Sequence, residues 1–122
     1  MNKLKIFAVV ILSIALMGIA NAKKQVSVGY VLVGPKNDGG WSMRHHQGFQ
    51  SLTKHGYEVS MVEMVPESES QKVFRKLARK HDIVFATSFG YMDGMVKAAK
   101  KNPDTIFMHA TGYKGNDTNM DN

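Results

Sequence analysis

The chain has 122 residues, no cysteine, and 16 basic against 10 acidic side chains, which give a formal net charge of +6 at pH 7. Without cysteine the chain cannot form a disulfide, a thiolate metal site or a lipid attachment through a cysteine. The basic residues do not alternate with aromatic residues, which disfavours a nucleic-acid-binding protein.

Residues 1–22 have the pattern of a cleaved signal peptide. Two lysines precede an apolar run over residues 6–19, and the small-residue sequence Ala-Asn-Ala ends the segment. The run is short for a membrane span, so a retained amino-terminal anchor is the less favoured alternative. We therefore expect export to the periplasm and one small domain over residues 23–122.

The first half of the mature chain predicts strand, helix and strand. A nearly continuous run of valine, leucine and tyrosine predicts a strand over residues 26–33 that is covered on both faces. After a glycine-rich loop, apolar residues at helical spacing predict a helix over about residues 41–55. Residues 57–65 predict a second strand, and its polar interruptions favour the edge of a sheet.

The second half repeats this alternation. Ser68 and Gln71 have the spacing of a capping box at the start of a second helix. The expected elements are this helix to about residue 80, a strand over 82–86, a helix over about 91–101 and a strand over 105–110. The remaining tail is polar, and we expect no core residue in it beyond Tyr113.

Strands that alternate with helices predict an α/β fold, a Rossmann-like doubly wound parallel sheet. An edge-like second strand favours the strand order 2-1-3-4, which has its switch point between the first and third strands. The loops that follow these two strands meet at the carboxyl edge of the sheet, where ligands bind in such folds. The sequence therefore predicts a small-molecule site built from residues 34–40 and 87–94.

The first loop offers four candidate ligand-binding residues: Asp38, Gly39, Gly40 and Trp41. Its sequence, GPKNDGGW, lacks the lysine and hydroxyl residues of a phosphate loop. The glycines allow close approach of a ligand, or only a turn with positive φ. Asp38 can accept hydrogen bonds from a ligand or cap the next helix. Trp41 can stack on a planar ring, with a core position as the alternative.

The second loop offers five more candidates: Ser88, Phe89, Gly90, Tyr91 and Asp93. Phe89 provides a second aromatic surface, whereas Ser88 can cap the next helix. Asp93 lies in the first helical turn, where the helix dipole stabilises a carboxylate. The histidines and acids show no metal-ligand spacing or catalytic triad, and the G-x-S-x-G motif is absent. We therefore expect no catalytic residue, no metal and no cofactor.

Three segments carry a resemblance to a known family: VGPKNDGGWSMRHHQG, IVFATSFGYMDGM and MHATGY. They resemble the basic membrane protein family, substrate-binding components of ABC importers related to purine-nucleoside-binding lipoproteins. The resemblance, over residues 26–113, implies part of the amino-terminal lobe of a two-lobed type I periplasmic-binding fold. It implies a purine base, nucleoside or similar small molecule as ligand, an ABC permease in the inner membrane as partner, and no catalysis. It carries over all of the loop candidates above except Ser88.

The sequence departs from the family pattern in three ways. His46 stands where an acidic residue usually follows a histidine, and the cysteine for lipid attachment is missing. The chain also stops at Asn122, where the resemblance predicts the rest of the first lobe and a whole second lobe. We therefore expect a truncated member or a fragment that binds its cargo weakly or not at all, with the fourth strand as an exposed edge.

Two other functions stay open at this point. A small flavodoxin-like enzyme or cofactor-binding protein has the same strand order, and it predicts a bound chromophore or an acid–base pair. A signalling or receptor-docking protein that has lost transport is the second alternative, and it predicts a membrane sensor as partner.

Overall fold

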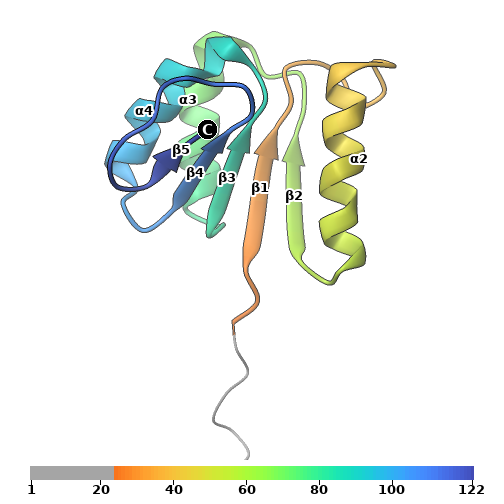
Figure 1. The fold of residues 1–122 in the computed structure, drawn as a ribbon, viewed down its shortest axis with the longest axis horizontal. Helices are drawn as coiled ribbons and strands as arrows, with labels where there is room; N and C mark the ends of the chain where they lie inside the picture. Colours follow the sequence, from red (N-terminus) through yellow and green to blue (C-terminus); the bar gives the residue numbers. More distant parts are fainter. Residues whose placement is uncertain (1–23) are drawn as a thin grey trace, which may run out of the picture.

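The computed structural model describes residues 24–122, so the predicted signal peptide lies outside the described residues. They form one parallel sheet with the strand order β2-β1-β3-β4-β5 (Figure 1). The strands are β1 (Ser27–Val31), β2 (Glu58–Val62), β3 (Ile83–Ala86), β4 (Ile106–His109) and β5 (Met120–Asp121). The parallel α/β sheet and the order of its first four strands confirm the sequence prediction.

Helices cover both faces of this sheet. They are α2 (Trp41–Lys54), α3 (Ser70–Ala78) and α4 (Met92–Lys101), with the 3-10 turns η1 (Glu67–Glu69) and η2 (Phe89–Tyr91). Successive residues of a strand point to opposite faces. The Tyr30 ring of β1 stacks on Phe49 of α2 with centroids 4.0 Å apart, whereas Gly29 faces Leu77 of α3. Thus α2 lies on one face, and α3 and α4 lie side by side on the other (Figure 1).

The main core lies between the sheet and the layer formed by α3 and α4. Phe74 of α3, Met95 of α4 and Phe107 of β4 are fully buried there. Phe74 and Leu77 are three residues apart, so both fall on the side of α3 that faces the sheet. Complete burial of one such side chain contributes about 1.5–3 kcal/mol. This layer therefore holds the strands in place and fixes the edge from which the loops emerge.

The expected capping box at the start of α3 is wrong. No side chain caps this helix, because η1 runs directly into it and the Glu67 carbonyl accepts the backbone N–H of Ser70. The Ser70 hydroxyl also donates to the Glu67 carbonyl, at 2.7 Å. The 3-10 turn thus supplies acceptors that the sequence pattern assigned to Ser68.

The tail also differs from the prediction, because it returns to the sheet as β5. Met120 is buried beside β4, whereas Tyr113, the expected last core residue, is exposed. The Asn119 side-chain amide anchors this return. It donates to three backbone carbonyl oxygens, those of Ala99, Asn102 and Thr105, at 3.2, 3.0 and 2.8 Å. As a result β4 is paired on both sides instead of being an exposed edge.

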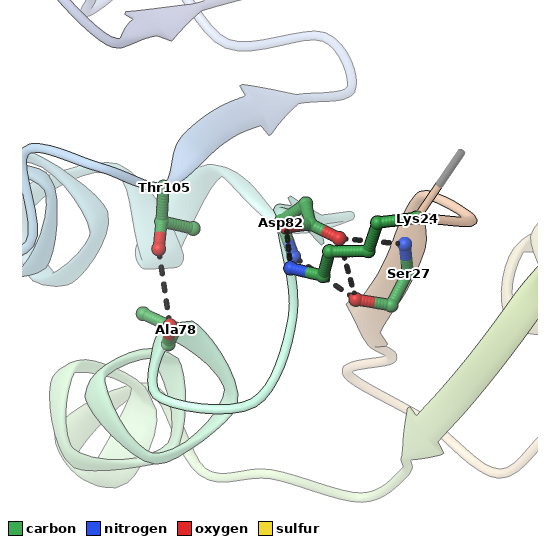
Figure 2. A network of polar contacts seen from close by, with 5 residues as sticks. All are labelled: Lys24, Ser27, Ala78, Asp82 and Thr105. Carbon is green, nitrogen blue, oxygen red and sulfur yellow. Dashed lines mark hydrogen bonds and ion pairs between the residues drawn. The ribbon is translucent and has the colours of Figure 1, made fainter. Parts of the chain in front are cut away.

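Polar contacts close the amino edge of the sheet (Figure 2). The Asp82 carboxylate accepts hydrogen bonds from the backbone N–H and the hydroxyl of Ser27, both at 2.9 Å, and pairs with Lys24 at 2.8 Å. Close by, the Thr105 hydroxyl donates to the Ala78 carbonyl at 3.0 Å. The Lys24 contact, and then those from Ser27, hold the pKa of Asp82 well below its ordinary value. These groups are used for structure, and the candidate site lies at the opposite, carboxyl edge.

Candidate functional site

The two predicted loops lie side by side at the carboxyl edge of the sheet. The indole N–H of Trp41, the first residue of α2, donates to the carbonyl of Thr87, just after β3, at 2.6 Å. The Thr87 hydroxyl in turn donates to the carbonyl of Val31, the last residue of β1, at 3.0 Å. These contacts confirm that the loops after β1 and β3 meet at one edge.

An open pocket of about 350 Å³ lies where the loops meet. Its lining residues are Val33, Trp41, Thr87, Ser88, Phe89 and Thr111. Trp41 is 45% exposed and Phe89 is 62% exposed, so neither is a core residue. The His45 ring lies against the indole, with centroids 4.2 Å apart and the planes inclined by 52°. The pocket thus combines aromatic rings with backbone groups, as small-molecule sites do.

Asp38 is largely occupied by the backbone of its own loop. One carboxylate oxygen accepts the N–H groups of Gly40 at 2.8 Å and Met43 at 3.0 Å, and the other accepts that of Ser42 at 3.0 Å. The hydrogen bonds from Met43, Gly40 and Ser42 lower the pKa of Asp38 to about 2. A carboxylate has about four acceptor positions. The Ser42 hydroxyl also interacts with this carboxylate, so helix capping uses nearly all of the acceptor positions of Asp38.

The two glycines of the first loop form the turn that carries Asp38 into this capping position. Gly39 has a φ of +74°, a conformation that favours glycine. A Cβ added to Gly39 or Gly40 would meet nothing within 4 Å. The turn is therefore open on its outer side, and its backbone is accessible to a small molecule.

The second loop is held from two sides. The Nε2–H of the buried His109 donates to the Ser88 carbonyl at 2.6 Å, while its Nδ1 has no hydrogen-bond partner among residues 24–122. On the other side, the Ser88 hydroxyl donates to the Glu67 carboxylate at 3.2 Å instead of capping the following helix. A Cβ on Gly90 would overlap the same carboxylate. The two hydrogen bonds of Ser88, with His109 and with Glu67, therefore constrain the backbone next to the exposed Phe89.

Six of the nine predicted site residues are not among those that line the pocket: Asp38, Gly39, Gly40, Gly90, Tyr91 and Asp93. Tyr91 is completely buried and its hydroxyl donates to the Val65 carbonyl at 2.6 Å, so its side chain is part of the core, and a ligand contact by Tyr91 stays a prediction. Burial raises the pKa of Tyr91 to about 12. Asp93 is exposed and forms an ion pair with Lys114 of the tail. The hydrogen bond from Lys114 lowers the pKa of Asp93. A ligand contact by Asp93 stays a prediction.

Three residues of this edge escaped the sequence predictions: Val33, Met64 and Thr111. Val33 and Thr111 line the pocket, and Met64, which follows β2, is 65% exposed. Met64 and Thr111 have φ values of +57° and +66°, which are uncommon for residues other than glycine. Backbone strain of this kind clusters at binding sites. The only available signal was the position of Thr111 inside the MHATGY segment.

Residues 24–122 lack two other kinds of feature. They contain no group of three or more histidine, aspartate or glutamate side chains that could hold a metal ion. None of their helices combines the length and the apolar character needed to cross a bilayer. The rings and backbone groups at the carboxyl edge are therefore the features on which the candidate site rests.

Comparison with known proteins identifies relatives of this arrangement. The family model Bmp, described as ABC transporter substrate-binding protein PnrA-like, matches residues 25–122. A purine-binding protein of Brucella abortus (strain 2308) is 40% identical over 102 residues, which cover 80% of this chain and 29% of that protein. A Haloferax volcanii protein named for glucose binding in an ABC transporter is 38% identical over 92 residues, 73% of this chain and 24% of that protein.

A solved structure shares the fold. The solute-binding protein of an ABC transporter system from Conexibacter woesei DSM 14684 aligns with a TM-score of 0.63 and 22% sequence identity, over 68% of this chain and 28% of that chain. The α/β fold is thus that of ABC solute-binding proteins, as the sequence predicts. The relatives are substrate-binding proteins and not enzymes. The chain spans less than a third of the length of each of these three relatives.

Proposed function

Because this chain belongs to the Bmp family of PnrA-like ABC transporter substrate-binding proteins, we propose that its carboxyl sheet edge forms one wall of a binding site for a purine base or nucleoside. The observation that carries the proposal is the hydrogen bond from the Trp41 indole to the Thr87 carbonyl. It fixes the orientation of an exposed indole in the same pocket as the exposed Phe89 ring. The name of the Brucella abortus relative favours a purine as the ligand.

Stacking is the main contact expected at this wall. A purine is flat and aromatic, and it presents a face that can lie on an indole or a phenyl ring. The Trp41 N–H is already used by Thr87, so the indole is left to act through its ring surface. Stacking of a base on an aromatic side chain contributes about 1–3 kcal/mol.

Polar groups of the first loop then form hydrogen bonds with the polar edge of the ligand. The Asp38 carboxylate is exposed, and one N–H of a base or one ribose hydroxyl can replace the Ser42 hydroxyl as its fourth partner. The open backbone at Gly39 and Gly40 allows close approach at the same place. Asp38 therefore acts twice, once through the backbone capping bonds that fix its carboxylate and once through the contact that the ligand takes over from Ser42.

A single wall predicts weak binding. A Kd of 1 mM corresponds to about 4 kcal/mol, more than the stacking contribution alone supplies. We therefore expect the chain alone to bind a nucleoside with a Kd above about 1 mM. In the relatives, more than two thirds of the length lies outside the matched part. A facing lobe from such a segment would bury the other side of the ligand, as in hinged binding proteins. The proposal includes export of this protein to the periplasm and delivery of the bound ligand to an ABC permease.

The chain's single tryptophan makes the proposal testable by fluorescence, because all tryptophan emission comes from Trp41. Adenosine, guanosine and glucose are titrated separately up to 20 mM, on the order of the weak affinity expected. Both nucleosides should quench the emission along a saturable curve, with half-saturation above about 1 mM. Glucose should leave the emission unchanged.

Two substitutions sharpen this titration. Phe89→Ala removes the second ring and should weaken nucleoside binding about fivefold, the equivalent of about 1 kcal/mol. Tyr57→Ala removes an exposed ring just before β2, at the opposite end of the sheet, and should leave the curve unchanged. Equal responses to glucose and to the nucleosides, or an unaltered curve for Phe89→Ala, would overturn the purine proposal.

A further inference from the structure

The outer sides of α3 and α4 concentrate positive charge that the proposed ligand site does not use. The α3 side, with the turn that follows, exposes Lys72, Arg75, Lys76, Arg79 and Lys80. The α4 side exposes Lys97, Lys100 and Lys101. In contrast α2, on the other face of the sheet and longer than either helix, carries Arg44 and Lys54 as its lysine and arginine residues. The eight basic side chains of α3, its following turn and α4 are here called the α3–α4 basic face.

The spacing of the basic residues of α3 places their side chains in one row along the helix. Lys72, Arg75, Lys76 and Arg79 follow each other at steps of three, one and three residues, which places them on one side of a helix. They line an open hollow of about 580 Å³. The neighbouring α4 lies close enough that a Cβ on Gly94 would meet the Ser70 hydroxyl. The outer sides of the two helices therefore form one continuous surface.

Little negative charge neutralises this surface. Glu69 pairs with Lys72 at 3.5 Å, and Asp93 is paired with Lys114 of the tail. Within residues 24–122, Arg75, Lys76 and Arg79 take part in no ion pair. Like charges three and four residues apart destabilise a helix. The helix dipole favours Arg75 and Lys76 in the last turn of α3, and an external anionic surface would relieve the repulsion within the row.

We propose that the α3–α4 basic face adsorbs to the anionic phospholipid headgroups of a membrane. The large apolar residues exposed within residues 24–122 all lie outside α3 and α4. The face thus lacks the aromatic and aliphatic anchors of a protein–protein interface, and also the rings that stack on single-stranded nucleic acid. Flexible lysine and arginine side chains spread over two helices match a fluid layer of phosphates, whose attraction accumulates with each charge.

Adsorption through this face leaves the ligand site free. The pocket beside Trp41 is lined by residues of the loops at the carboxyl ends of β1 and β3. The basic face is carried by α3 and α4, which form a layer against one face of the sheet (Figure 1). If the proposed function holds, adsorption also concentrates the protein where a permease takes up its cargo. The adsorption itself does not depend on that function, and its test contains no purine.

Vesicle sedimentation tests the proposal directly. The purified chain is mixed with vesicles of phosphatidylcholine alone, or of phosphatidylcholine with phosphatidylglycerol, at low ionic strength. We expect at least about 100-fold stronger partitioning to the anionic vesicles, and loss of this preference in about 0.5 M salt because salt screens the attraction. The neutral vesicles measure the adsorption that does not depend on charge, whereas the contribution of the lysines in residues 1–23 is the same in the unchanged chain and in the variants described next.

A matched pair of triple variants separates this face from net charge. Arg75→Gln/Lys76→Gln/Arg79→Gln should reduce partitioning to anionic vesicles about 100-fold, or about fivefold for each charge removed. Lys36→Gln/Arg44→Gln/Lys54→Gln removes the same charge elsewhere and should reduce it less than about threefold. All six positions are exposed side chains, and circular dichroism checks that both variants fold.

Three results would overturn the proposal. The first is equal partitioning to neutral and anionic vesicles. The second is an equal loss for the two triple variants, which would mean that net charge and not the face is responsible. The third is release from the vesicles by inorganic phosphate, but not by chloride of the same ionic strength, which would indicate a discrete site for free phosphate.

Discussion

Trp41 owes its orientation to one polar contact with a distant part of the chain. The Thr87 carbonyl that accepts its indole N–H lies 46 residues further along. The neighbouring Ser88 carbonyl is taken by the buried His109. Two successive carbonyls of one loop are thus bonded to side chains from different elements. The exposed ring of Phe89 follows directly, so its backbone has little freedom to move.

Asp38 gives a prediction in which pH is the variable. Folding lowers the pKa of Asp38 from 3.8 to about 2, so ionisation of this carboxyl favours the folded state. This stabilisation is present above the unfolded pKa and is lost as the pH falls through the range from 3.8 to about 2. We expect Asp38→Asn to be less stable than the unchanged chain at pH 7, and the difference to shrink across that range. Thermal unfolding at a series of pH values measures it.

The control for this series is Asp104→Asn, which removes an exposed carboxylate from the turn before β4. Its unfolding temperature should stay close to that of the unchanged chain at each pH. A deficit of Asp38→Asn that has the same size at pH 7 and at pH 2 would show that ionised Asp38 does not cap α2.

At the scale of the elements, β5 is the part that the sequence did not predict. It has two residues, Met120 and Asp121, and they follow a polar run with no period-two pattern. Its position depends on the Asn119 side chain, which finds three carbonyl acceptors around the end of α4. Such a contact depends on tertiary structure, so it cannot be predicted from a local sequence pattern. The longer elements were predictable because their apolar residues repeat with a clear period.

Asn119→Asp tests this anchoring with almost no change of shape. The substitution replaces a double donor by an acceptor that faces three carbonyl oxygens, and an unpaired group of this kind costs about 1–3 kcal/mol or more. We expect a lower free energy of unfolding in urea. We also expect faster hydrogen exchange at the backbone N–H of Phe107, which donates to the Asn119 carbonyl at 2.7 Å.

The terminal Asn122→Asp provides the matched control, because its side-chain amide forms no hydrogen bond in residues 24–122. It should change the free energy of unfolding by less than about 0.5 kcal/mol. Equal stabilities of the two variants, or unchanged exchange at Phe107, would show that Asn119 does not hold β5 against β4.

The second loop shows where sequence reasoning about a site stops. Phe89 and Tyr91 are both aromatic and two residues apart, and the sequence offered both as ligand contacts. The η2 turn sends them in opposite directions, so that Phe89 is exposed and Tyr91 is buried. The deciding group is the Val65 carbonyl, which accepts the Tyr91 hydroxyl from beyond β2. The positions of the loops were predictable from topology, whereas the direction of each side chain was not.

At the scale of the whole molecule, the two edges of the sheet differ in kind. The amino edge uses its charged and hydroxyl groups internally, in the contacts of Asp82 with Lys24 and Ser27 (Figure 2). The carboxyl edge exposes large apolar side chains after four of its strands. They are Val33 after β1, Met64 after β2, Phe89 after β3 and Tyr113 after β4. The amino edge also exposes Val26, Tyr57 and Ile106, so what distinguishes the carboxyl edge is that two loops meet there and form a pocket.

Titration of the ¹⁵N-labelled chain with adenosine, followed by two-dimensional nuclear magnetic resonance, tests most directly whether this edge is the ligand wall. The largest shift changes should occur at the indole N–H of Trp41 and at the backbone amides of Phe89 and Thr111, the residues that line the pocket. The amide of Ser27, at the amino edge, should not shift. Shifts that are largest at the amino edge, or on the α3–α4 basic face, while the Trp41 indole signal stays in place, would contradict the proposed site.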